Sequence, residues 1–286
     1  FRSTPELSFA VRDLGAAVGI VISASHNPPL DNGFKAYWSD GAQLVSPHDK
    51  GVLAVAADIT EIHAIDFTSA IDEGKIVIIG SEVDSRYIAA VANEAEGTSR
   101  NLKIVYSPLH GSGQTNTLPV LRAVGFTDIS LVDDQMVPDG NFPTIQNGKP
   151  NPEEKVANDR AVAQMLATKA DIAVTNDPDA DRIGIMVRVR DEAVYLSGNQ
   201  SAVLATDYAL RKLHEKGELT PKHYIAKTVV TTDMLVALAE HYNVNIYTNM
   251  LIGFKYIGEL ILSKEKTDEI FVIGGEESYG LLKGDY

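Results

Sequence analysis

Residues 171–187 read DIAVTNDPDADRIGIMV, and this stretch decides the fold class. Its short apolar runs, DIAVT and RIGIMV, each predict a β-strand, and the polar loop NDPDAD joins them. The preceding stretch, EEKVANDRAVAQMLATK, has helical periodicity, with Val156, Val162 and Leu166 predicted on its buried face. A helix that leads into short buried strands is typical of α/β layering.

The same alternation extends in both directions along the chain. Further helices are predicted within PELSFAVRDLGA, residues 45–59, EVDSRYIAAVANEA, TLPVLRAVGF, AVLATDYALRKLHEK, DMLVALAEHY and FKYIGELILS. Further strands are predicted within VGIVIS, which is expected to be buried, and within GFKAYW, LKIVYSPLHGSG, DISLVD, HYIAKTVV, VNIYT and EIFVIGG. The pattern predicts three successive α/β domains with mixed sheets flanked by helices, at residues 1–85, 86–197 and 198–286.

Composition excludes several classes of protein. The net charge of −14 argues against general nucleic-acid binding, which needs a basic surface. No apolar run approaches the roughly 20 residues of a membrane span, and the first residues lack the pattern of a signal peptide. With no cysteine, a cytoplasmic location is expected. A small anionic substrate fits if cations gather locally. Oligomeric state is not readable, and the ends of the sequence suggest a fragment.

The loop DPDADR is the strongest chemical signal. Asp177, Asp179 and Asp181 stand at alternate positions and can converge on one hard cation. A calcium-binding EF-hand loop is excluded because Arg182 and Arg188 occupy the positions of its glycine and its last glutamate. An aspartyl nucleophile of a phosphatase and a solvated acidic turn remain as alternatives.

Two other polar loops follow predicted strands. In SASHNPPLDNGFKAYW, residues 23–38, Pro28 and Pro29 stiffen the loop and would hold Ser25 at a fixed tip. An ordinary turn is the alternative, and no serine-protease pattern accompanies this serine. In GGEESYG, the side chains of Glu276 and Ser278 could bind a polyhydroxylated ligand, although for this loop alone an ordinary surface turn is the better interpretation.

Taken in order, the three loops resemble the α-D-phosphohexomutase family, which contains phosphoglucomutases and phosphomannomutases. SASHNP is similar to the family's phosphoserine loop, DPDADR to its magnesium loop and GEESYG to its sugar-recognition loop. The likeness continues through NGFKAYW, PLHGSG, PNPEE, SGNQ, KTVVTTDM and GFKYIGE, and so covers nearly the whole chain. The resemblance implies a protein of four domains around a central cleft, the first three being α/β domains of related fold.

The resemblance also implies a role for each matching residue. Ser25 would carry the phosphoryl group, and Mg²⁺ would be held by an oxygen of that phosphoserine with Asp177, Asp179 and Asp181. Lys35 and Arg182 would assist proton transfer and neutralise charge. The substrate-binding positions would be Glu276, Ser278, Lys255, Lys227 and His26. Without the resemblance, the lysines could be solvated surface groups, and His26 and His110 could merely bind backbone.

The implied activity is that of an isomerase of carbohydrate metabolism. It interconverts a hexose 1-phosphate and a hexose 6-phosphate, with glucose favoured, through phosphoserine and an activating glucose 1,6-bisphosphate. Mannose or pentose phosphates are alternatives within the family; a phosphohydrolase using Asp177 and a noncatalytic sugar-phosphate-binding fragment are alternatives outside it. The family's arginine-bearing start and its fourth domain, which holds a phosphate clamp, have no counterpart in this sequence, and Ser3 and Ile252 depart from the usual residues. Little turnover is therefore expected from this chain alone.

Overall fold

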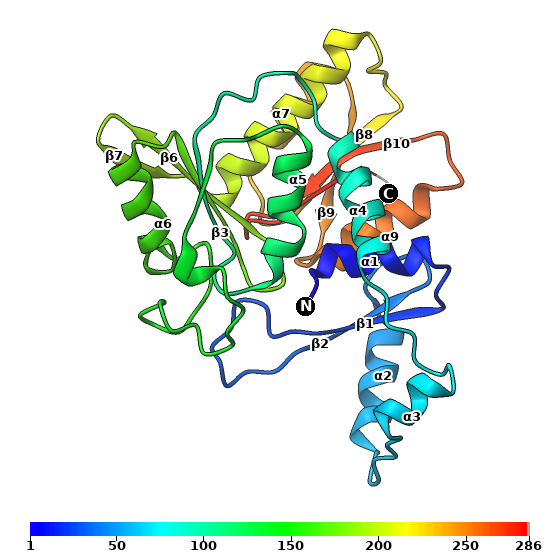
Figure 1. The fold of residues 1–286 in the computed structure, drawn as a ribbon. Helices are drawn as coiled ribbons and strands as arrows, with labels where there is room; N and C mark the ends of the chain where they lie inside the picture. The colour runs from blue at the N-terminus through cyan, green and yellow to red at the C-terminus, as the bar shows by residue number, and fades with distance from the viewer. Residues whose placement is uncertain (285–286) are drawn as a thin grey trace.

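The computed structural model describes residues 1–284, in which the strands form three sheets, one in each third of the chain (Figure 1). Helices pack on each sheet, and the middle and last sheets contain both parallel and antiparallel pairs. The predicted fold of three α/β domains is confirmed. The exact boundaries of the domains stay a prediction, and the last two residues of the predicted third domain lie outside the described residues.

The first third is built around an antiparallel pair of strands. Its elements are α1 (Thr4–Asp13), β1 (Val18–Ile22), β2 (Phe34–Trp38), α2 (His48–Ala57) and α3 (Phe67–Asp72). Helix α1 begins where the Ser3 side chain accepts a hydrogen bond from the amide of Glu6 at 3.2 Å. Because Ile22 pairs with Phe34, residues 23–33, which include Ser25, form the loop that connects the two strands of this hairpin.

Strand β1 is not buried as predicted. Val18, Ile20 and Ile22 are 53%, 53% and 70% exposed, because β1 pairs only with β2 and α1 covers one face of the hairpin. On the covered face, Gly19 packs against Val11 of α1. Helix α2 has no buried residue and projects away from the body of the molecule with α3 (Figure 1).

The middle third forms a five-stranded mixed sheet in the order β4-β3-β5-β6-β7. Its helices are α4 (Ser81–Asn93), η1 (Ser112–Thr115), α5 (Thr117–Ala123), η2 (Asp133–Gln135) and α6 (Lys155–Thr168). Its strands are β3 (Ile104–Ser107), β4 (Ile129–Leu131), β5 (Ile172–Asn176), β6 (Ile183–Val189) and β7 (Glu192–Tyr195). The antiparallel pair β5–β6 presents the acidic loop at its turn.

The face that α6 buries differs from the predicted one. The buried residues are Ala157, Asn158, Ala161 and Met165, whereas Val162 and Leu166 lie at the border of the core and are only partly buried. Small alanine side chains let the helix backbone approach the sheet closely, so the contact line runs through them rather than through the larger aliphatic residues.

The last third forms a four-stranded sheet in the order β11-β10-β8-β9. Its elements are α7 (Gly198–Lys216), β8 (His223–Thr228), α8 (Met234–Tyr242), β9 (Asn245–Met250), α9 (Phe254–Lys264), β10 (Ile270–Gly275) and β11 (Leu281–Lys283). A capping box between Ser197 and Gln200 starts α7. The antiparallel turn from β10 to β11 carries GEESYG.

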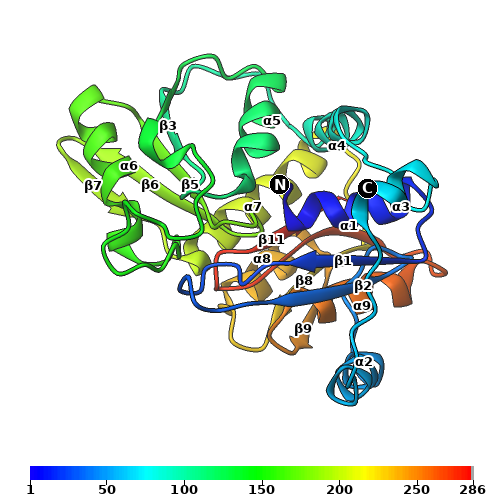
Figure 2. The ribbon, with the colours of Figure 1, turned by 60° about the horizontal axis from the view of Figure 1, so that its bottom comes forward.

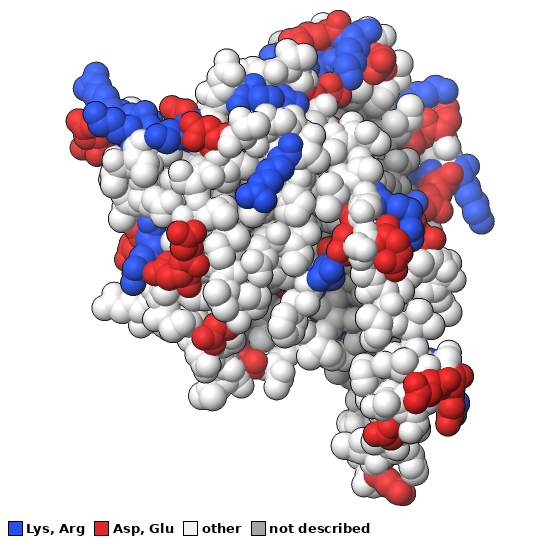
Figure 3. Space-filling view, viewed as in Figure 1, with Lys and Arg blue, Asp and Glu red and all other residues white. Residues whose placement is uncertain are grey.

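The thirds are packed together around a common hollow. Helix α1 lies between the β1–β2 hairpin and α4 (Figure 2). The amide of Ile183 donates to the carbonyl of Tyr279 at 3.0 Å, which joins the end of the acidic loop to the β10–β11 loop. On the face drawn in Figure 3, acidic and basic side chains are interspersed over the body, and acidic ones gather on the projecting α2–α3 segment. Along residues 1–284, every helix is too short or too polar to cross a bilayer.

Candidate active site

Three carboxylates converge on the loop between β5 and β6. One oxygen of each of Asp177, Asp179 and Asp181 lies within 4.8 Å of the others. The turn is tight: Ala180 has a φ of 53°, and the amide of Arg182 donates to Asp177 Oδ1 at 3.0 Å. These contacts aim the carboxylates at one point instead of letting them spread into solvent.

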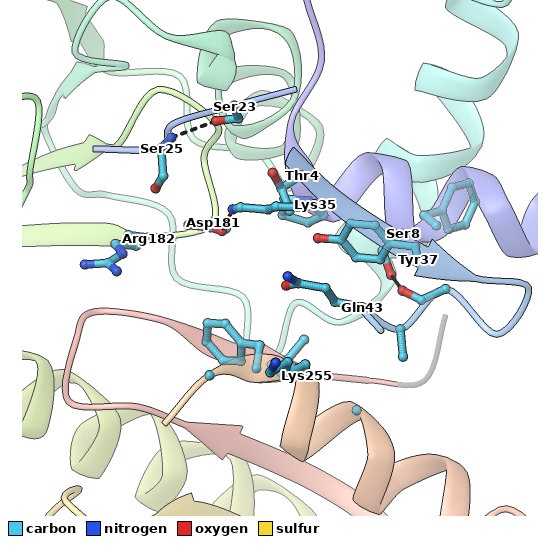
Figure 4. Close-up of a pocket in the computed structure, with 18 of the residues that line it drawn as sticks. Thr4, Ser8, Ser23, Ser25, Lys35, Tyr37, Gln43, Asp181, Arg182 and Lys255 are labelled. Carbon is cyan, nitrogen blue, oxygen red and sulfur yellow. Dashed lines mark hydrogen bonds and ion pairs between the residues drawn. The ribbon is translucent and has the colours of Figure 1, made fainter. Parts of the chain in front are cut away.

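Ser25 meets this cluster from the end of the β1–β2 hairpin. Its Oγ donates to Asp177 Oδ2 at 2.6 Å and lies 3.1 Å from His26 Nδ1. The residue itself is in the left-handed region, with a φ of 52°, and its amide donates to Ser23 Oγ at 2.8 Å (Figure 4). A loop that holds a serine in this uncommon conformation fixes the direction of its hydroxyl.

Lys35, on β2, faces the same cluster (Figure 4). Its Nζ lies 2.8 Å from an oxygen of Asp179 and 2.8 Å from an oxygen of Asp181. Burial alone would lower the pKa of this lysine, but the charges of Asp181 and Asp179 outweigh burial and raise it. Lys35 is therefore a permanent cation that partly neutralises the cluster.

The cluster has the electrostatics of a site made for a cation. Burial, followed by the charges of Asp181 and Asp179, raises the pKa of Asp177 well above its ordinary value. Burial also acts to raise the pKa of Asp179, yet Lys35 and the hydrogen bonds around it lower that pKa overall. Asp179 Oδ1 is buried and has no hydrogen-bond partner among residues 1–284. Converging carboxylates with an unsatisfied buried oxygen fit a hard divalent cation such as Mg²⁺.

Two hydroxyls that the sequence did not single out hold Asp179. Thr4 Oγ1 and Ser23 Oγ each donate to Asp179 Oδ2 at 2.9 Å, and the amide of Thr4 donates to the carbonyl of Asp179 at 2.9 Å. No local pattern marks these residues, because Thr4 is 175 positions and Ser23 is 156 positions away from their partner. Ser23 did lie within the quoted loop.

The motif PLHGSG packs against the acidic loop and supports it. The amide and the hydroxyl of Ser112 both donate to the carbonyl of Pro178, at 2.7 and 2.9 Å. Gly111 packs so closely there that a Cβ would lie 2.2 Å from Pro178 Cα. In the sequence, PLHGSG matched a motif of the family, but no role was predicted for it. In the structure, this motif fixes the backbone of the acidic loop.

A cavity of about 700 Å³ opens beside Ser25 and brings most of the predicted site residues together. Glu276 is buried at its edge; its carboxylate accepts from the amide of Gly253 and, at 3.3 Å, from Ser278 Oγ. Burial raises the pKa of Glu276. The predicted residues that line this cavity are Ser25, His26, Lys35, Asp181, Arg182, Lys255, Glu276 and Ser278.

Like Lys35, the cationic groups of Arg182 and Lys255 line the cavity and already have acidic partners. Arg182 contacts Glu153 at 3.0 Å, and Lys255 at the start of α9 contacts Asp49 of α2 at 3.0 Å.

Burial, followed by the charge of Arg182, lowers the pKa of His26, so its ring is neutral near pH 7. The cleft thus holds a neutral imidazole, a buried carboxyl and several paired cations around one serine hydroxyl.

The structure does not bring Lys227 to this cleft, which corrects its predicted place facing the substrate. Lys227 is 2% exposed, and its Nζ donates to the carbonyls of Thr228 and Thr231 at 3.3 and 2.6 Å. The hydroxyls of those two threonines donate to Glu277 at 3.3 and 3.1 Å. The lysine therefore supports the turn that contacts Glu277 of the β10–β11 loop.

The fold and this cleft define a multidomain α/β protein in which a serine hydroxyl lies beside a cluster of three carboxylates that could hold a cation. Comparison with known domain families gives three matches, described as phosphoglucomutase/phosphomannomutase, alpha/beta/alpha domains I, II and III. They cover residues 1–63, 85–190 and 197–286. The chain belongs to the phosphoglucomutase/phosphomannomutase family, as the resemblance predicted.

Individual relatives carry both names. The chain is 36% identical over 291 residues to a phosphoglucomutase of Staphylococcus epidermidis, covering 99% of this chain and 51% of that one. It is 33% identical over 279 residues to a phosphomannomutase of Mycoplasmoides pirum, covering 96% of this chain and 49% of that one. The crystal structure of a putative phosphomannomutase from Thermus thermophilus is 26% identical, with a TM-score of 0.74 over 99% of this chain and 58% of that chain. The chain spans about half the length of the curated relatives it matches.

Proposed function

We propose that this chain supplies the phosphoserine, metal-binding and sugar-recognition parts of a phosphohexomutase that interconverts hexose 1-phosphate and hexose 6-phosphate. The observation that carries the proposal is the contact between Ser25 Oγ and Asp177 at 2.6 Å, at a cluster of three carboxylates. Phosphoryl transfer asks the protein for alignment and charge stabilisation, which a fixed hydroxyl beside a cation site provides.

In the proposed reaction, phosphorylated Ser25 gives its phosphoryl group to the free hydroxyl of a hexose phosphate. The P–O bond to Ser25 breaks, a P–O bond to the sugar forms, and the proton of the sugar hydroxyl ends on Ser25 Oγ. The bisphosphate then turns over in the cleft and returns its other phosphoryl group to the serine. Asp177, Asp179 and Asp181 would hold Mg²⁺, which, when bound, neutralises charge on the phosphoryl oxygens.

Lys35 has a second assignment in this scheme, that of stabilising negative charge on the transferring phosphoryl group. Its ammonium is permanent in the resting site and lies against two of the three carboxylates, so a positive group is already in place beside Ser25. His26 is neutral and within 3.1 Å of Ser25 Oγ, which suits a hydrogen-bonding role toward the phosphoryl group or the sugar.

Sugar recognition is assigned to the β10–β11 turn. Glu276 and Ser278 present oxygens to the cleft and would bind hydroxyls that the two orientations of the bisphosphate share. Arg182 and Lys255 would bind the phosphate that does not react. Glucose is the favoured hexose, because FKAYWSDGAQ and GEESYG look closer to the phosphoglucomutase and phosphopentomutase branch than to the bacterial mannose enzymes; mannose and pentose phosphates are the alternatives.

Mass spectrometry after incubation with glucose 1,6-bisphosphate and Mg²⁺ tests the proposal. We expect phosphate on Ser25 in the wild-type chain and none in Ser25→Ala. Label on Asp177 instead would identify an aspartyl phosphohydrolase, and no label on either would leave only sugar-phosphate binding. Substrate choice is then measured with the full-length protein, as the ratio of kcat/KM values for glucose, mannose and pentose 1-phosphates.

A further inference from the structure

An ion pair joins two distant parts of the chain at the wall of the cleft. Lys255 Nζ lies 3.0 Å from Asp49 Oδ2, although the two residues are 206 positions apart. Lys255 belongs to the first turn of α9 and lines the cavity, whereas Asp49 belongs to the first turn of α2. Their side chains are 24% and 27% exposed, so the pair is neither buried nor fully solvated.

The position of Lys255 makes an anionic partner favourable. The amino-terminal end of a helix carries a partial positive charge, and a lysine ammonium there is stabilised when an anion lies beside it. In the resting structure that anion is Asp49, whose other oxygen accepts a hydrogen bond from the amide of Lys50 at 2.7 Å. A phosphate dianion entering the cleft would satisfy the same cation more strongly than one carboxylate does.

Asp49 can move away from Lys255 with little loss of folding stability. It sits on α2, which has no buried residue, so a shift of this helix gives up little packing. Partly exposed ion pairs contribute little to stability, because water and salt screen them. Lys35, another paired cation of the cleft, is held more firmly, because its Nζ contacts two carboxylates.

We propose that Asp49 is a resting counter-ion for Lys255, which a phosphate group of the phosphosugar displaces when it enters the cleft. This inference rests on the proposed function, because it takes a sugar phosphate as the ligand. It makes Asp49 a residue that weakens substrate binding, since every binding event must first release Lys255. It also favours strongly charged ligands over neutral sugars.

Titration calorimetry of the 286-residue chain with glucose 6-phosphate, in Mg²⁺ and low salt, tests the inference. Asp49→Asn keeps the size of the side chain and removes its charge, so we expect the Kd to fall by about two- to fivefold, as the release of one exposed ion pair implies. Asp49→Glu retains the charge and should keep the wild-type Kd. An unchanged or higher Kd for Asp49→Asn would overturn the inference; a higher value would mean that the pair closes the cleft around the ligand.

Two further variants separate this effect from a general change in charge. Asp268 forms another ion pair, with Lys222 at 2.9 Å, in the same third of the chain as Lys255. Asp268→Asn removes this carboxylate and should leave the Kd unchanged. Lys255→Met should weaken binding, and adding Asp49→Asn to it should have no further effect. A full Asp49→Asn effect in the Lys255→Met background would show that Asp49 acts through some other cation and would refute the pairing.

Phosphorylation of Ser25 keeps the inference and the proposed function apart. If Ser25 accepts phosphate from glucose 1,6-bisphosphate but Asp49→Asn binds glucose 6-phosphate no more tightly, only the inference fails. If Asp49→Asn tightens binding of glucose 6-phosphate while Ser25 never becomes phosphorylated, the counter-ion role holds and the mutase assignment fails.

Discussion

Asp179 shows how one carboxylate can be prepared for a cation by its neighbours. Its Oδ2 accepts hydrogen bonds from Thr4, Ser23 and Lys35, whereas its buried Oδ1 has no partner within residues 1–284. The saturated oxygen fixes the orientation of the group, and the other oxygen is left for an incoming ligand. Outer groups that orient a metal-binding carboxylate in this way commonly matter for affinity.

Removing one of these donors should be costly. Thr4→Val keeps the shape of the side chain but removes its hydroxyl. The backbone amide of residue 4 can still donate its hydrogen bond to the Asp179 carbonyl. Because hydrogen bonds to charged groups contribute about 1.5–3 kcal/mol, we expect the free energy of unfolding in urea to fall by that order. Thr60→Val, at an exposed position, serves as the control and should change it little. Equal stability of the two variants would contradict the orienting role of Thr4.

A change at Asp177 should separate cation binding from folding. Its raised pKa reflects burial and repulsion by the other two carboxylates, so Asp177→Asn should raise the Tm of the chain in EDTA. The same change removes a ligand, and we expect Mg²⁺ or Mn²⁺ affinity, measured by calorimetry or electron paramagnetic resonance, to fall about tenfold or more. Asp191→Asn, at an exposed position, should alter neither quantity. A lower Tm together with intact cation binding would rule out this cluster as the metal site.

Sequence could identify the residues whose signal is local. Asp177, Asp179 and Asp181 carry their own spacing, and Ser25 stands in a loop stiffened by prolines. Thr4 could not be found, because its role depends on a contact across 175 positions. Lys227 was misplaced, because a motif gives the position of a side chain along the chain but not whether it folds back onto neighbouring carbonyls.

At the scale of elements, close packing holds the acidic loop in place. The turn that precedes η1 lies against Pro178 with room for a glycine only, since an added Cβ would lie 2.2 Å from Pro178 Cα and 2.5 Å from its oxygen. The φ of Gly111 is −103°, which any residue can adopt, so the constraint is space and not backbone conformation. Backbone cannot move aside as a flexible side chain can, and the loop would have to shift.

Gly111→Ala should therefore destabilise the chain and loosen the cation site together. Overpacking typically costs about 1–3 kcal/mol, and we expect a loss of this order in the free energy of unfolding, with weaker Mg²⁺ binding in the folded protein. Gly140→Ala is the matched control, because apart from its chain neighbours no atom of residues 1–284 lies within 4 Å of its added Cβ. If Gly111→Ala matched the Gly140→Ala variant in both measurements, the loop would not depend on this contact.

The longest elements were predictable, and several of the short ones were not. Helices such as α7 and α9 have sustained periodicity, but α3, β7 and β11 are six, four and three residues long and were not predicted. Such segments are defined by the strand or turn they pack against, not by their own pattern. The exposure of β1 escaped prediction for the same reason: an apolar run indicates a strand but not how many neighbours cover it.

At the scale of the whole molecule, the site exists only because three distant loops meet. The order of the loops can be read along the sequence, and the family resemblance implies their roles. That the loops lie side by side depends on contacts between distant residues, such as Ser25 with Asp177, 152 positions apart. Helix α1 is central to this assembly, because it touches the acidic loop through Thr4 and packs against both β1 and α4. What holds α1 to α4 therefore matters for the site as well as for stability.

Glu6 is the titratable group at that contact. It is 3% exposed, close to Asp84 of α4, and 3.8 Å from Arg2. Burial, a hydrogen bond with Asp84 and the charge of Asp84 raise the pKa of Glu6 to about 8, with Arg2 opposing in part. At neutral pH the folded protein therefore keeps a proton on Glu6 that the unfolded chain has released, since an ordinary glutamate has a pKa of about 4.3.

This difference fixes the sign of the pH dependence. Stability from Glu6 is fully present below pH about 4.3, declines by at most about 1.4 kcal/mol per pH unit above it, and is lost once the pH passes the folded pKa near 8. Glu6→Gln imitates the protonated group without titrating, so its free energy of unfolding in urea should fall less between pH 5 and 8 than that of the wild type. Glu61→Gln, at an exposed position, should follow the wild-type curve. Parallel curves for wild type and Glu6→Gln would mean that no proton is retained between Glu6 and Asp84, and that packing and ion pairs such as Arg2 with Asp84 hold α1 to α4.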